Sequence, residues 1–113
     1  MSESNEQRRL HEEDTAQVAE EVVCTELPDD EAVLLHIGTR RILRLNSTGL
    51  FIWRRIALGE SFGAIGQAMQ QTYGIPRSRA NADVTELVAE LVAEELVAVE
   101  RRPATDGGTG SER

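Results

Sequence analysis

A chain of 113 residues with a formal net charge of −8 is long enough for one small domain and too acidic for general nucleic-acid binding. No apolar run approaches the roughly 18 residues that a membrane span requires. The N-terminus is polar and acidic, which is not typical of a secretory signal. We therefore expect a cytoplasmic protein without a membrane segment.

Both ends of the chain contain few large apolar side chains. Residues 1–21 carry seven acidic groups against two arginines, and residues 100–113 are mostly Arg, Pro, Thr, Gly and Ser. Segments of this composition bury too little apolar surface to offset the entropy of ordering. The sequence therefore predicts an acidic flexible tail over 1–21, one domain over 22–99, and a second flexible tail over 100–113.

Three short segments have the composition or alternation typical of strands. Residues 22–27 are rich in β-branched side chains, and a Pro-Asp-Asp turn ends them. Residues 32–37 and 41–45 flank a tight Gly-Thr-Arg turn, which predicts a hairpin. In this hairpin we expect Leu43 to face the core, and Leu34 to lie with Ile42 on the less buried face.

Three helical patterns follow the hairpin. Asn46 or Ser47 can cap the first helix, and Ser61 can cap the second, which we expect to end at Gly74. Pro76 suits the first turn of the third helix, which we expect to end near residue 97. The predicted fold is therefore α+β and winged-helix-like, with a three-stranded antiparallel sheet followed by three helices.

The third helix carries a broad apolar stripe, and two interpretations of it remain open. The stripe consists of Val84, Leu87, Val88, Leu91 and Val92. Periodicity alone favours an ordinary core. The alternative is a groove in which this stripe forms a wall beside an open strand edge. Trp53, between apolar residues of the first helix, is interpreted as a core anchor.

Several short motifs in this order resemble the PqqD-like family. They are the string Leu45-Asn46-x-x-Gly49-x-x-Ile52-Trp53, the pair Asp83-Val84 and the closing pair Leu96-Val97. The similarity spans residues 31–99. The resemblance implies a stand-alone domain that binds leader peptides of ribosomally made natural products and delivers them to a modifying enzyme. That enzyme would be a radical SAM protein, a leader protease or a cyclase.

The resemblance also implies where the leader would bind. In PqqD-like domains the leader adds as a strand beside the third strand and packs against the third helix. The matching peptide-binding positions in this sequence are Arg41, Ile42, Leu43, Arg44, Leu45, Asp83, Val84, Leu87, Val88, Leu91 and Val92.

The charged residues near this site have two interpretations each. Arg40, Arg41 and Arg44 either attract acidic leader residues or form a solvated hairpin that discourages aggregation. Asp83 either contacts the leader or stabilises the start of its helix through the helix dipole. The sequence does not decide between these interpretations.

Catalysis has little support in the sequence. His11, His36 and Cys24 stand alone, without partners at metal-ligand or catalytic spacing. We therefore expect no enzyme activity, no cofactor and no metal. Two other functions compete with leader binding. A winged-helix DNA-binding regulator is disfavoured because the second helix offers glutamines and no basic residue. A module that forms a homodimer through its edge strand stays open.

Overall fold

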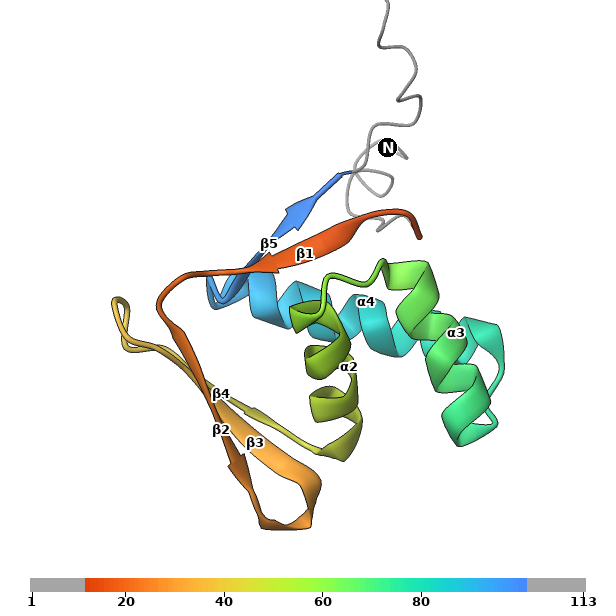
Figure 1. Cartoon of the computed structure of the whole chain (residues 1–113), viewed down its shortest axis with the longest axis horizontal. Helices are drawn as coiled ribbons and strands as arrows, with labels where there is room; N and C mark the ends of the chain where they lie inside the picture. The colour runs from red at the N-terminus through yellow and green to blue at the C-terminus, as the bar shows by residue number, and fades with distance from the viewer. Residues whose placement is uncertain (1–11, 102–113) are drawn as a thin grey trace, which may run out of the picture.

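The computed structural model describes residues 12–101, in which a three-stranded antiparallel sheet is followed by three helices and a small two-stranded sheet lies across them (Figure 1). In chain order the elements are β1 (Thr15–Val18), β2 (Val22–Leu27), the 3-10 turn η1 (Pro28–Asp30), β3 (Glu31–His36), β4 (Ile42–Leu45), α2 (Ser47–Ala57), α3 (Phe62–Tyr73), α4 (Arg77–Ala93) and β5 (Val97–Glu100). The larger sheet has the order β2-β3-β4, and β1 pairs with β5. The predicted α+β class is confirmed.

The helices begin where local capping chemistry places them. The Asn46 side chain accepts a hydrogen bond of 2.8 Å from the Gly49 backbone N–H, and the Ser61 hydroxyl accepts one of 3.2 Å from Ala64. Gly74 closes α3 in the left-handed conformation, with a φ of 67°. These caps were predicted from the sequence and are confirmed.

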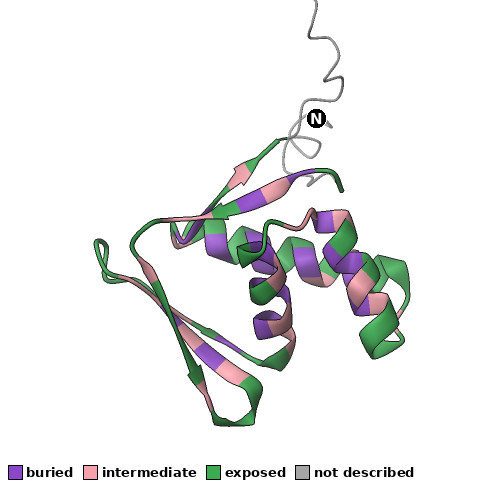
Figure 2. Ribbon diagram, viewed as in Figure 1, coloured by how far each residue is buried: buried purple, intermediate pink, exposed green. Residues whose placement is uncertain are grey.

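The core is formed by the inner face of the larger sheet, by the three helices α2, α3 and α4, and by the small sheet (Figure 2). Trp53 is buried, so its interpretation as a core anchor is confirmed. The prediction for Leu34 was wrong, because this side chain is fully buried. Leu34 lies directly opposite Leu43, and paired residues of an antiparallel sheet share one face. Ile42 lies on the exposed face, as expected.

The structure corrects the expected secondary structure at both ends of the domain. β1 lies inside the range 1–21 that we expected to be a tail, and β5 begins where we expected the third helix to end. The two strands pair from Thr15↔Glu100 to Val18↔Val97, and Ala16 is buried. The helix ends earlier because the chain turns at Glu95, whose φ is 64°. The division into domains stays a prediction, since residues 1–11 and 102–113 lie outside the described residues.

Candidate functional site: a groove between β4 and α4

A groove of about 390 Å³ separates the edge strand β4 from helix α4. Its lining residues come from three parts of the chain. They are Arg44, Leu45 and Asn46 at the end of β4, Thr48, Gly49 and Ile52 on α2, and Arg79, Asp83, Glu86, Leu87 and Glu90 on α4. Leu45, Ile52 and Leu87 are buried and form an apolar floor, while the walls are polar. The groove is therefore a polar cleft with an apolar base.

The edge of β4 that does not face β3 has free backbone groups. The His36 backbone N–H donates a hydrogen bond of 2.9 Å to the Arg41 carbonyl. This bond shows which residues of β4 are hydrogen-bonded to β3. Because antiparallel pairs alternate, Leu43 and Leu45 direct their backbone groups to β3, and Ile42 and Arg44 direct theirs away from it. Within residues 12–101 no further strand pairs with this side of β4. Two N–H and two C=O groups are thus available to an added strand.

The apolar stripe of α4 is mostly core. Val84, Val88 and Leu91 have exposed fractions of 2%, 1% and 0%, and none of them lines the groove. Helix α4 packs against α3 and β5, and this packing covers the stripe. Val92 is 43% exposed but does not line the groove. These findings support the core interpretation of the stripe, with Leu87 as its one member at the groove.

Of the eleven positions predicted to bind peptide, the structure brings four together in the groove lining. They are Arg44, Leu45, Asp83 and Leu87. Arg41, Ile42 and Leu43 lie along the same strand and offer backbone or a link to α4. The role of all these positions in peptide binding stays a prediction.

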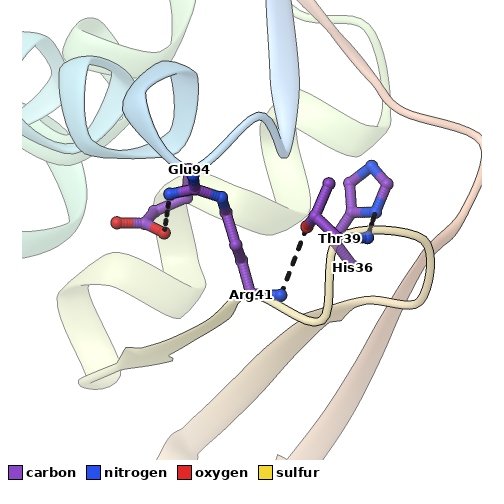
Figure 3. Close-up of polar contacts among 4 residues, drawn as sticks. All are labelled: His36, Thr39, Arg41 and Glu94. Atoms are coloured by element: carbon purple, nitrogen blue, oxygen red, sulfur yellow. Dashed lines mark hydrogen bonds and ion pairs between the residues drawn. The ribbon is translucent and has the colours of Figure 1, made fainter.

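The arginines of the hairpin already have acidic partners. Arg44 lies 3.0 Å from a carboxylate oxygen of Glu31 on β3, and Arg41 lies 3.3 Å from Glu94 beyond the end of α4 (Figure 3). On the opposite wall, Arg79 lies 3.8 Å from Asp83. An arginine that is already paired attracts an acidic ligand less strongly than a free one. Two of the three arginines in the predicted basic spot, Arg41 and Arg44, are therefore paired with neighbouring carboxylates.

The turn of the hairpin orients Arg41 toward α4. The Thr39 backbone N–H donates a hydrogen bond to His36 Nδ1, and the Arg41 backbone N–H donates one to the Thr39 hydroxyl (Figure 3). The donor–acceptor distance is 3.2 Å in both. Arg40 has a φ of 67°, the left-handed conformation that reverses the chain. The Arg41 guanidinium then reaches Glu94 and ties the start of β4 to the end of α4.

Two acidic lining residues were not among the predicted site positions. Glu86 and Glu90 are exposed on α4, and neither forms an ion pair with a described residue. Their spacing contained a signal, because Asp83, Glu86, Glu90 and Glu94 recur every three or four residues and so share one helix face. The other lining residues that were not predicted are Asn46, Thr48, Gly49, Ile52 and Arg79, and of these Asn46 had been interpreted as a helix cap.

No histidine or cysteine of the described residues lines the groove. Cys24 lies on β2, and burial together with the negative charge of Glu26 raises the pKa of its thiol, which disfavours the reactive thiolate. Among residues 12–101 no three His, Cys, Asp or Glu side chains are grouped to hold a metal ion. In the same part of the chain no helix has the length and apolar character needed to cross a membrane. The arrangement suits binding.

Comparisons with known proteins agree with this geometry. The structure of TbiB1 in complex with the TbiA(beta) leader peptide superposes with a TM-score of 0.67 at 28% identity, covering 72% of this chain and 93% of that one. A lasso peptide synthetase B1 complexed with the leader peptide has the same fold, with a TM-score of 0.67 at 23% identity and coverage of 74% and 96%. No curated protein sequence gives a significant match. The family described as coenzyme PQQ synthesis protein D (PqqD) matches residues 31–97, and the chain therefore belongs to the PqqD family.

Proposed function

We propose that the protein binds the leader segment of a precursor peptide and presents it to a modifying enzyme. The observation that carries the proposal is the free edge of β4 beside the groove, in a chain of the PqqD family whose relative TbiB1 was solved with a leader peptide. The protein itself acts as a binding domain and catalyses no step. The modification belongs to the partner, a radical SAM protein, a leader protease or a cyclase.

Binding would proceed by strand addition. A leader strand antiparallel to β4 would exchange hydrogen bonds with the outward backbone groups of Ile42 and Arg44. Its side chains would point alternately into the groove and into solvent. Those that enter would contact the apolar floor formed by Leu45, Ile52 and Leu87. Main-chain bonds would supply much of the affinity, and the groove would supply the preference for certain leaders.

The leader must become ordered when it binds, and this ordering offsets part of the interaction energy. A dissociation constant near micromolar, which corresponds to about −8 kcal/mol, is expected for such an interface. Affinity in this range would let the leader be released after modification.

The DNA-binding alternative receives no support from the groove, because its walls carry more acidic than basic residues. Homodimer formation through β4 uses the same free edge and is therefore a separate outcome of the test. The two possibilities differ in what happens when peptide is added, since an added leader would compete with the second copy.

The test is an NMR titration of the ¹⁵N-labelled full-length protein with synthetic leaders of the short precursor peptides encoded beside its gene. We expect amide shifts to concentrate on residues 41–46 and on the groove side of α4. Sedimentation in the absence of peptide reports the dimer. Shifts confined to α3, or no shift with any neighbouring precursor, would contradict the proposal.

A further inference from the structure

We infer that the groove selects leaders that carry basic side chains on the face turned toward α4. This inference rests on the proposed function, because the groove and the free β4 edge define the binding site. The acidic residues do not create that site. They determine which strand fits into it.

The pairing of the charges on the groove walls leaves a negative surplus. Both arginines in the lining are engaged, Arg44 with Glu31 at 3.0 Å and Arg79 with Asp83 at 3.8 Å. Glu86 and Glu90 line the same groove and have no ion-pair partner among residues 12–101. A peptide entering the groove therefore meets two carboxylates whose charge the described part of the protein does not balance.

The positions of these carboxylates favour a particular spacing in the leader. Glu86 and Glu90 are four residues apart on one helix face, a rise of about 6 Å. In an extended strand, side chains on the same face recur every second residue, about 6.8 Å apart. For a leader strand that runs along α4, two basic residues at alternate positions would thus match the two glutamates. A single intervening residue would point toward solvent.

The opposite charge on the leader is excluded by the same arrangement. An acidic side chain directed at α4 would be repelled by the like charges of Glu86 and Glu90. Arg44 and Arg79 could pair with it only by breaking their present ion pairs. One of the two interpretations of the hairpin arginines was that they attract an acidic leader. With their ion pairs included, the groove favours a basic one.

The experiment selects displayed random dodecapeptides on three forms of the full-length protein. One form is wild type, one is the double variant Glu86→Gln and Glu90→Gln, and the control is the double variant Glu13→Gln and Glu100→Gln. The control removes the same charge from exposed glutamates that do not line the groove. NMR mapping of the winning peptides establishes that they bind at β4.

We expect peptides with Lys or Arg at alternate positions to be enriched on wild type and on the control, and not on the groove variant. A winning peptide should bind the groove variant roughly tenfold more weakly than wild type. The difference should shrink as ionic strength rises, because salt screens exposed charges.

The possible failures are distinguishable. If the selected peptides shift the amide signals of β4 but show no preference for basic residues, the inference is wrong and leader binding stands. Equal selection on all three forms has the same meaning. If no enriched peptide shifts the amide signals of β4, the proposed function is wrong, and so is the inference.

Discussion

The larger sheet has two open edges, β2 and β4, and they differ in what lies beside them. The Ile37 N–H donates to the Glu21 carbonyl, so the alternation leaves Val22, Cys24 and Glu26 with outward backbone groups on β2. Both strands therefore offer free hydrogen-bonding groups. The groove adjoins β4 and not β2, because Arg44 and Leu45 line it and no β2 residue does. Under the proposed function, the strand edge provides backbone groups for the leader and the adjoining helix provides the second wall of the groove.

The largest expected effect is a loss of stability, and it tests whether the apolar stripe of α4 belongs to the core. Val88→Asp places a charge where the side chain is 1% exposed, and we expect the free energy of unfolding to fall by about 3 kcal/mol or more. Val92→Asp, on the exposed side of the same helix, is the control and should change it by less than about 0.5 kcal/mol. Urea unfolding followed by circular dichroism measures both. A stable Val88→Asp protein would mean that the stripe is an accessible surface.

The second prediction compares the two edges directly. Ile42→Pro removes one outward N–H from β4 and keeps the ladder to β3, since proline is tolerated where the N–H faces away from the sheet. We expect leader affinity, measured by titration calorimetry, to fall at least tenfold, about 1.4 kcal/mol. Cys24→Pro makes the matching change on β2 and should leave affinity within about twofold. An equal loss of leader affinity in Ile42→Pro and Cys24→Pro would contradict the assignment of the leader to β4.

The third prediction uses the ion pair that each edge region forms with the helical layer. Arg41 pairs with Glu94 at the end of α4, and Glu26 on β2 pairs with Arg54 on α2 at 2.9 Å. Because both pairs are exposed, Arg41→Gln and Arg54→Gln should each cost less than about 1 kcal/mol of stability in urea unfolding.

The two variants should differ in leader affinity. Arg41→Gln releases the start of β4 from α4 and should weaken binding by a few-fold, while Arg54→Gln should leave it unchanged. Weaker binding in Arg54→Gln alone would place the leader near β2.

The smallest effect concerns Cys24 on the β2 edge. Burial, and next the charge of Glu26, raise the pKa of its thiol, so less thiolate is present at a given pH than in the unfolded chain. The rate of alkylation by iodoacetamide should therefore rise at higher pH in the folded protein than in urea. The alkylated protein should bind leader as the unmodified protein does. A loss of affinity would connect the β2 edge to the site.

Much of the local structure could be predicted from the sequence. Asn46, Ser61 and Gly74 define helix boundaries through bonds that reach only a few residues along the chain. The pairing of β1 with β5 could not be predicted, because it joins residues 15–18 to residues 97–100 and neither segment has a strong strand pattern alone. The burial of Leu34 was missed because alternation identifies two faces without saying which one meets the helices.

The candidate site divides in the same way. The sequence by itself determined the hairpin, the helices and the family motifs, since each depends on short-range spacing. Only the tertiary structure decided that Val84, Val88 and Leu91 belong to the core and that the groove walls are acidic. The physical reason is that burial and ion pairing depend on which elements meet. Glu31 on β3 engages Arg44 on β4 across the sheet, while Arg79 and Asp83 pair four residues apart within α4, and this leaves Glu86 and Glu90 to set the charge of the groove.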